Sequence, residues 1–406
     1  MPAPAENLLF RDHVAKAVSH ALRSHRGTAL LHLRLQDLKE TDPLEDLAAR
    51  IVACTRYPDS VVQLDGRSFA ILMSEFTRPE EAGLLAMRLG QAVTGAAAQN
   101  GTPLSAAVGI ALAPYETEDP DALMAAAGAA CEGALAAGEE LRFSSEEMNR
   151  VARVRAEISR DLPRALEAGE LRLHYHPQLD LESGRIKGAE ALLRWQHPQR
   201  GLLLPAEFVP LAEAFGPLDR MTAWVLRQAC ADAAGWAGGQ SRIAVNLSPR
   251  QLEDPATADL VSDILAETGL PEARLELEIT ESAVMGDVGS AARQLQRLRD
   301  LGVQLSLDDF GTGYSSLTLL KHLPVTKLKI DRSFVAGLED DRGDRAIVRA
   351  LIDLGRGLGL EVLAEGVERE PQLAFLREAG CTAVQGDLVS PPVEAGRIPA
   401  LLAGAG

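Results

Sequence analysis

The most constraining feature of the sequence is a series of short apolar runs that begins at Leu171. Stretches with helical spacing of apolar residues fill most of the gaps between them. We predict that these runs are strands, at residues 171–175, 186–193, 243–247, 275–280, 303–307, 327–330, 361–363 and 383–388. Eight strands alternating with helices over about 235 residues are typical of a TIM (β/α)8 barrel. The alternative is an open doubly wound sheet, which does not need eight strands, and no GxGxxG sequence follows the first run.

The part of the chain before Leu171 has a different order of elements. Two short apolar runs at 60–64 and 69–73 flank Asp65-Gly66, a pattern that predicts a tight hairpin. Predicted helices and two further strands surround it, which indicates an α+β layer domain. Residues 146–169 are rich in Arg, Glu and Ala and are predicted to form a helix. We therefore divide the chain into a domain at 1–146, a connecting helix at 147–169 and a barrel at 170–406.

Polar side chains stand at the C-terminal ends of most predicted barrel strands, where enzymes with this fold place their active sites. Glu278, Lys329 and Glu365 interrupt otherwise apolar strands, and a lone charge is costly to bury there. One such residue could be a paired structural charge, but their repetition from strand to strand favours a functional site. The full set, in chain order, is Glu190, Arg194, Asn246, Glu278, Glu281, Asp308, Asp309, Lys329, Asp331, Glu365, Glu368 and Gln385.

The ligand chemistry of this set points to hard metal ions. Carboxylate and amide oxygens without His or Cys favour Mg²⁺ or Mn²⁺ over zinc, and they come from Glu190, Asn246, Glu278, Asp308 and Asp309. Five such groups suit two ions bridged by water, an arrangement that generates hydroxide and neutralises a phosphodiester. The ammonium group of Lys329 suits a role in orienting that water, and the carboxylate of Glu365 suits a role in accepting its proton. The guanidinium group of Arg194 suits contact with a phosphate or with the edge of a guanine base.

Several long motifs in this half of the chain resemble the EAL domain family, the cyclic di-GMP phosphodiesterases. The resemblance runs from about Leu171 to Pro392. The matching motifs are EALLRW at 190–195, VNLS at 245–248, ELEITES at 276–282, DDFGTGYSSL at 308–317, LKIDRSFV at 328–335, AEGVE at 364–368 and QG at 385–386.

The resemblance implies hydrolysis of cyclic di-GMP to linear pGpG in a modified TIM barrel whose first strand is antiparallel. It assigns metal binding to Glu190, Asn246, Glu278, Asp308 and Asp309. It implies that Lys329 and Glu365 act on the attacking water. It also assigns nucleotide contacts to Arg194, Glu368 and Gln385. His176 stands where the family usually has a nucleotide-binding Gln. Glu281 is implied to support the loop at 311–314, which touches a homodimer interface between barrels.

The N-terminal domain resembles the GGDEF family, whose fold is ferredoxin-like. The match rests on LDGRSFAIL at 64–72 and AVGIA at 107–111. Arg67 and Ser68 replace the acidic residues that a cyclase needs, and no Asn-Asp-x-x-Gly-His stretch follows the first strand. We therefore expect a degenerate, regulatory domain. Arg56 and Asp59 have the spacing of the family's RxxD product-binding site, with a solvated loop as the alternative.

Charge and hydropathy narrow the choice of partners. The net charge of −17 is spread over both halves without a basic stripe, so duplex nucleic acid is not an expected partner. No apolar run is long enough for a membrane span, and the N-terminus lacks the pattern of a signal peptide, so we expect a cytoplasmic protein. Two other functions stay open: a non-catalytic cyclic di-GMP receptor that signals through the N-terminal domain, and a protein-interaction scaffold.

Overall fold

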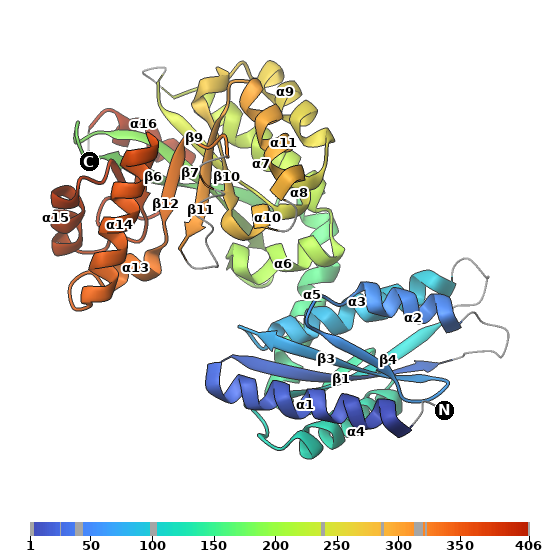
Figure 1. Cartoon of the computed structure of the whole chain (residues 1–406). Coiled ribbons are helices and arrows are strands. Elements are labelled where there is room, and N and C mark those ends of the chain that lie inside the picture. The colour runs from blue at the N-terminus through green and yellow to red at the C-terminus, as the bar shows by residue number, and fades with distance from the viewer. Residues whose placement is uncertain are drawn as a thin grey trace. The chain divides into compact units, whose positions relative to one another are not determined.

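The computed structural model describes residues 4–24, 26–36, 44–97, 104–236, 240–285, 288–311, 320 and 323–404. Its elements are labelled in Figure 1. The chain divides into two compact units. The first contains Met1–Pro163 and Glu207–Gly216, and the second contains Arg164–Ala206 and Pro217–Gly406. In the described part of the chain, no helix is both long enough and apolar enough to span a membrane.

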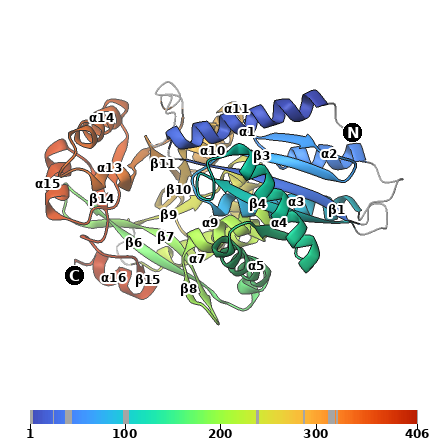
Figure 2. The same cartoon turned by 90° about the horizontal axis from the view of Figure 1, so that it is seen from below.

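The first unit is a sheet covered by helices on both faces. Strand order is β2-β3-β1-β4-β5, with only β4 and β5 parallel. In Figure 1, α2 and α3 lie above this sheet and α1 and α4 lie below it, and Figure 2 shows α1 and α4 from the lower side. The elements are α1 (Pro4–Ser24), β1 (Gly27–Gln36), α2 (Leu44–Ala53), β2 (Ser60–Gln63), β3 (Ser68–Phe76), α3 (Glu80–Ala97), β4 (Ser105–Ala113), α4 (Pro120–Ala137), β5 (Leu141–Phe143) and α5 (Glu146–Glu167).

Alternation along β1 explains the two covered faces. Leu31 and Leu33 belong to the core that α2 and α3 cover, whereas Leu30 belongs to the core that α1 and α4 cover. Helix α4 packs closely on β4, because a Cβ at Gly109 would lie 2.1 Å from the Cys131 backbone nitrogen. Glycine at this position lets the helix approach the strand.

The second unit is a closed barrel, which confirms the predicted modified (β/α)8 fold. Its sheet order is β15-β6-β14-β13-β12-β11-β10-β9-β7-β8, and a further β6–β7 pairing closes a ring that leaves out β15 and β8. The ring strands are β6 (Leu171–Asp180), β7 (Ile186–His197), β9 (Arg242–Leu247), β10 (Leu275–Thr280), β11 (Gln304–Phe310), β12 (Lys327–Ile330), β13 (Glu361–Ala364) and β14 (Ala383–Gln385).

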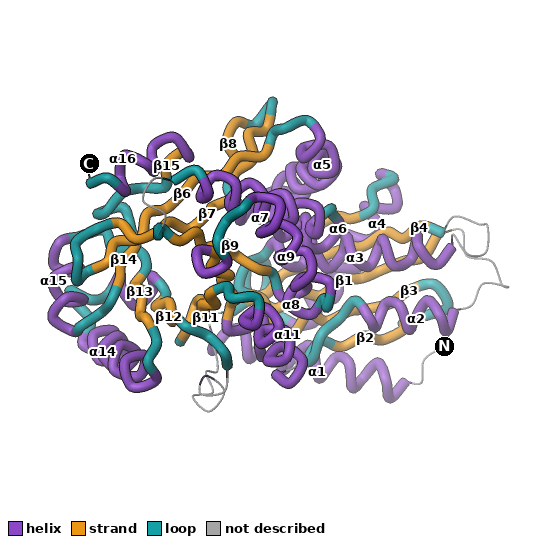
Figure 3. Tube along the Cα trace, turned by 90° about the horizontal axis from the view of Figure 1, so that it is seen from above, coloured by secondary structure: helices purple, strands orange, loops and turns teal. Residues whose placement is uncertain are grey.

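The first ring strand, β6, is antiparallel to both of its neighbours, and the other neighbouring ring strands are parallel. Figure 3 shows the strands in orange with helices in purple around them. The other elements of this unit lie outside the ring: β8 (Gly201–Leu203), α7 (Leu218–Ala234), α8 (Pro249–Glu253), α9 (Ala256–Thr268), α10 (Glu281–Met285), α11 (Val288–Asp300), α13 (Arg332–Ala336), α14 (Arg342–Leu358), α15 (Glu370–Ala379), β15 (Val393–Glu394) and α16 (Ile398–Leu402), with short 3-10 turns at Glu272–Arg274 and Ala395–Arg397. Helix α6 (Pro205–Phe215) follows β8 in the chain, but most of it belongs to the first unit.

The last ring strand is shorter than predicted, because β14 ends at Gln385 rather than at residue 388. The chain turns at Gly386, where a Cβ would lie 2.2 Å from the Val367 carbonyl oxygen. The apolar spacing at 315–322 also predicts a helix, and this stretch falls mainly outside the described residues.

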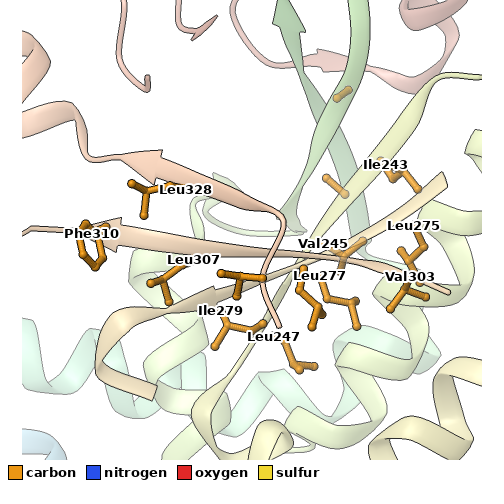
Figure 4. Packing of buried hydrophobic residues seen from close by; sticks show 14 of the residues in the cluster. Ile243, Val245, Leu247, Leu275, Leu277, Ile279, Val303, Leu307, Phe310 and Leu328 are labelled. Carbon is orange, nitrogen blue, oxygen red and sulfur yellow. The ribbon is translucent and has the colours of Figure 1, made fainter. Parts of the chain in front are cut away.

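Alternation along the ring strands separates apolar from charged side chains. Leu275, Leu277 and Ile279 of β10 pack with helix residues in the large core, and Figure 4 shows them beside equivalent residues of β9, β11 and β12. Glu276 and Glu278 alternate with them and pair with lysines of β12. The sequence pattern therefore places charged residues inside the barrel, where they meet across strands.

Candidate active site

Lys329 lies at the centre of the charged cluster inside the barrel. Its side chain is fully buried, and its Nζ lies 2.7 Å from Glu278, 2.7 Å from Glu365 and 3.2 Å from Asp308. A fourth carboxylate, Glu190, lies at 3.8 Å. Burial alone lowers the pKa of Lys329, but the surrounding carboxylates outweigh it and raise the pKa well above its ordinary value.

Two amide side chains hold the carboxylate of Glu190. Asn246 Nδ2 donates to Glu190 Oε1 at 2.7 Å, and Gln385 Nε2 donates to Glu190 Oε2 at 2.6 Å. Burial raises the pKa of Glu190, but Lys329 and these two hydrogen bonds outweigh it and leave the pKa lowered. Glu190 is therefore held ionised, with one oxygen oriented by the neighbouring strand β9 and the other by β14, on the far side of β6.

The end of β11 brings Asp308 and Asp309 to the same place. Asp309 has a positive φ of 56°, and its N–H donates to Asp308 Oδ1 at 2.9 Å. This left-handed conformation turns the strand end and lets consecutive side chains reach one site. Oxygen atoms of Asp308, Asp309 and Glu365 lie within 4.8 Å of one another.

The carboxylates of the site outnumber the lysine that they share, and their pKa values reflect the excess negative charge. Burial and the nearby Glu190 raise the pKa of Glu278 well above its ordinary value, although Lys329 opposes this. Burial raises the pKa of Glu365 to about 7, again against Lys329. Burial and Asp308 raise the pKa of Asp309. Such crowded carboxylates are stabilised by additional positive charge.

The donor set fits divalent metal ions. All its ligand atoms are oxygens, which hard cations such as Mg²⁺ and Mn²⁺ prefer. Glu278 Oε1 is buried and has no hydrogen-bond partner among the described residues, so it is available as a ligand. The residues that would hold metal are Glu190, Asn246, Glu278, Asp308, Asp309 and Glu365.

The residues implied to contact nucleotide lie around this cluster. Arg194 follows Glu190 by four residues on β7, and the two side chains interact electrostatically. Gln385 Nε2 lies 3.1 Å from His176 Nδ1, and burial lowers the pKa of His176. Glu368 is exposed in the loop after β13. Gln385 and His176 therefore adjoin Glu190 directly, whereas Glu368 stands at the rim.

Glu281 begins α10, and its Oε2 accepts a hydrogen bond from the Gly311 N–H at 3.3 Å. This contact ties the end of β10 to the turn after β11. The predicted supported loop continues through Thr312, Gly313 and Tyr314, which lie outside the described residues.

Asp331, one of the polar residues at the strand ends, has a structural function. It caps α13, where its side chain accepts a hydrogen bond from the Ser333 N–H at 3.0 Å.

A second buried charged pair was not predicted from the sequence. Lys327 Nζ lies 2.6 Å from Glu276 inside the barrel, nearer the N-terminal ends of the strands. The signal for this pair was present in the sequence, because Glu276 and Lys327 alternate with apolar residues in step with Glu278 and Lys329.

In the first unit, the Arg56 and Asp59 pair takes part in local hydrogen bonds. Asp59 accepts from the N–H groups of Ser74 and Arg56, and Arg56 Nη2 donates to the Glu75 carbonyl. At the hairpin turn, Asp65 Oδ1 accepts from the Arg67 N–H at 2.7 Å, and Ser68 is buried. These contacts support the loop and the turn without any ligand.

Comparison with known protein families gives two matches. The EAL domain model matches residues 159–392, and the model of the diguanylate cyclase GGDEF domain matches residues 6–140. Two similar proteins come from Pseudomonas aeruginosa. The bifunctional diguanylate cyclase/cyclic di-GMP phosphodiesterase MucR is 38% identical over 98% of this chain and 60% of its own length. The cyclic di-GMP phosphodiesterase NbdA is 39% identical over 91% of this chain and 49% of its own length.

The barrel also resembles a solved structure. The PaMucR phosphodiesterase in complex with c-di-GMP is 44% identical to this chain, covers 60% of it and 99% of its own chain, and superposes with a TM-score of 0.58. The chain spans about half to three fifths of the length of the curated relatives it matches.

Proposed function

The chain belongs to the EAL domain family, with a GGDEF domain on its N-terminal side, and we propose that its barrel hydrolyses cyclic di-GMP to linear pGpG with two Mg²⁺ or Mn²⁺ ions. The observation that carries the proposal is the convergence of four carboxylates around Lys329, with Asp309 close to two of them, towards the C-terminal ends of the barrel strands. The cyclic di-GMP phosphodiesterases among its relatives support the choice of substrate.

In the proposed mechanism, the carboxylates and Asn246 would hold the metal ions, which would supply positive charge to the phosphodiester and acidity to a water molecule. Glu365 would accept a proton from that water, since it lies beside Lys329 and its oxygens are close to those of Asp308 and Asp309. Lys329 is held in place by Glu278 and Glu365 and orients the water. The water oxygen would form a bond to phosphorus as the bond from phosphorus to the ribose oxygen breaks. Glu365 would return its proton to the ribose oxygen, which leaves as a hydroxyl group.

Around the reacting group, Arg194 contacts a phosphate or a guanine edge, and Gln385, His176 and Glu368 contact the nucleotide. Gln385 also fixes Glu190, so it joins nucleotide binding to metal binding. We further propose that residues 1–146 form a degenerate regulatory domain, that 147–169 connect it to the barrel at 170–406, and that barrels form a homodimer near the loop supported by Glu281.

The direct test is a hydrolysis assay with purified protein, cyclic di-GMP and Mg²⁺ or Mn²⁺. We expect linear pGpG as the product, no turnover in excess chelator, and no turnover by Asp308→Asn. A matched control is Asp353→Asn, which changes an exposed residue of α14. Failure of the unmodified protein to hydrolyse cyclic di-GMP with either metal would refute the proposal. Tight binding without turnover would instead favour a receptor.

A further inference from the structure

The amide nitrogen of Gln385 lies between two side chains of the candidate site. Its Nε2 is 2.6 Å from Glu190 Oε2 and 3.1 Å from His176 Nδ1. Gln385 is 3% exposed and Glu190 is 6% exposed, so water does not compete strongly for these groups. A primary amide nitrogen carries two hydrogens, which is one for each of its two neighbours.

The carboxylate of Glu190 determines which way this amide points. The pKa of Glu190 is lowered, because Lys329 and two hydrogen bonds outweigh its burial, so its oxygens accept hydrogen bonds and do not donate them. If the amide were turned over, its oxygen would face Glu190 Oε2 at 2.6 Å, and two acceptors repel each other at that distance. The nitrogen of Gln385 therefore faces both Glu190 and His176, and it donates to both.

The hydrogen bond from Gln385 determines the state of the His176 ring. Its Nδ1 accepts, so it carries no hydrogen, and the hydrogen of the neutral ring lies on Nε2. Burial lowers the pKa of His176, which favours the neutral ring. His176 lies on β6, opposite Glu190 of β7, and β14 with Gln385 pairs with the same strand. The ring therefore supports the amide from the strand between β7 and β14.

This series of contacts ends on a proposed metal ligand. Gln385 orients Glu190 Oε2, and His176 holds the second hydrogen of the same amide. Without an acceptor at position 176, that hydrogen is left unpaired in a buried place, which is unfavourable. The amide then gains by turning away from Glu190 to reach another acceptor. The orientation of Glu190 therefore depends on the side chain at position 176.

We propose that His176 is a positioning residue, which acts through Gln385 on Glu190 and so sets the metal affinity of the candidate site before any nucleotide binds. The inference rests on the proposed metal site. It differs from the nucleotide contact expected of His176, because it needs only the Nδ1 atom and no bound nucleotide.

The metal-free protein tests the arrangement itself. Nitrogen NMR of the full chain with ¹⁵N-labelled histidine shows which ring nitrogen carries hydrogen, and the resonances of His176 are those missing from His176→Asn. We expect a bare Nδ1 and a protonated Nε2, and loss of this preference in Gln385→Met. A hydrogen on Nδ1 at neutral pH overturns the proposal. This measurement needs neither metal nor hydrolysis, so it separates failure of the inference from failure of the proposed function.

Two substitutions of equal shape isolate the acceptor atom. His176→Asn places an oxygen close to the position of Nδ1, whereas His176→Leu places a methyl group there. Calorimetric titration with Mn²⁺, without cyclic di-GMP, measures metal affinity. We expect His176→Asn to bind within about twofold of the unmodified protein and His176→Leu to bind about threefold to tenfold more weakly. Equal affinity of the two variants overturns the proposal, because the acceptor would then have no effect.

A double variant tests whether the effect passes through Gln385. In a Gln385→Met background, we expect His176→Leu to cause no further loss of Mn²⁺ affinity, because the contact it removes is already absent. A further loss of the same size overturns the assignment to Gln385. His20→Leu, which changes an exposed histidine of α1, is the control and is expected to leave Mn²⁺ affinity unchanged. If His176→Leu does not fold, as judged by circular dichroism, the NMR measurement decides the test.

Discussion

At the scale of single residues, Lys329 is the side chain on which the candidate site depends. It is fully buried, and four carboxylates lie within 4.0 Å of its ammonium group. Buried carboxylates without a counter-charge are strongly destabilising, so the lysine stabilises the fold as well as the site. These two effects can be separated by adding metal.

We predict that Lys329→Met abolishes hydrolysis and lowers the free energy of unfolding by about 3 to 5 kcal/mol without metal, because it leaves the carboxylates unpaired. Added Mg²⁺ or Mn²⁺ is expected to raise the melting temperature of this variant more than that of the unmodified protein, because the ions restore positive charge. Thermal denaturation with and without metal measures both effects. Lys187→Met, which changes an exposed lysine, is the control. An equal metal response in both proteins would contradict a shared site.

We predict that Gln385→Met weakens metal binding or hydrolysis about 10-fold to 100-fold, a usual cost of removing a group that orients a metal ligand. The physical reason is the loss of the 2.6 Å hydrogen bond that fixes Glu190 Oε2. The rate measured over a range of Mg²⁺ concentrations separates a loss of metal affinity from a loss of maximal rate. Gln228→Met, in which the replaced amide bonds Asp232 outside the candidate site, is the control. An unchanged metal dependence would show that Glu190 does not need this support.

At the scale of elements, β10 and β12 each have one apolar face, which packs in the large core, and one charged face inside the barrel. In β10 and β12, leucine and isoleucine alternate with glutamate and lysine. Period-two alternation sends the apolar set to the helices and the charged set into the barrel. The same short strands therefore provide both the core and the candidate site.

The loop between α2 and β2 provides a test at this scale. We predict that Asp59→Ala destabilises the protein by about 1 kcal/mol, because the half-buried N–H of Ser74 and the exposed N–H of Arg56 lose their acceptor. Urea denaturation measures the change. Asp46→Ala, in the first turn of α2, serves as a comparison. If Asp59→Ala leaves stability unchanged but removes cyclic di-GMP bound to the first unit, the RxxD motif is a binding site and the structural interpretation is wrong.

At the scale of the whole molecule, the chain does not divide cleanly at one point in the sequence. Residues Glu207–Gly216, which include most of α6, group with the first unit although they lie between barrel strands in the sequence. Leu162 of α5 contacts this segment, since a Cβ at Gly216 would lie 3.1 Å from Leu162 Cδ2. Phe208 and Leu211 of α6 are buried.

We therefore predict that a chain starting at residue 147, which keeps α5, is more stable than one starting at residue 170, which loses Leu162. Removing one large buried side chain commonly costs about 2 to 5 kcal/mol, so the difference is measurable by thermal denaturation. Hydrolysis by the longer of the two chains, compared with the full chain, reports on regulation by residues 1–146. Equal melting temperatures for the two shortened chains would show that α6 does not depend on α5.

Much of the fold and the residue types of the site could be predicted because both depend on local patterns. The alternation of Glu278 with Leu277 and Ile279 already indicates one charged and one apolar face. The buried pair of Glu276 and Lys327 was missed, since a charge at the start of a strand is also compatible with solvent. The cavity lined by Gln178, Arg242, Lys327 and Glu361 could not be predicted, because its wall joins β6 to strands that lie far away in the sequence.

The sequence by itself determined the class of both folds, the oxygen-rich donor set and the polar strand ends. These features depend only on the spacing of apolar residues and on the chemistry of each side chain, which are local properties of the chain. Tertiary structure decided which of those groups meet. Closure of the ring through the antiparallel β6 places Gln385 and Asn246 on opposite oxygens of Glu190 and brings four carboxylates to Lys329. Such contacts depend on strand register across the whole barrel, which a local pattern does not contain.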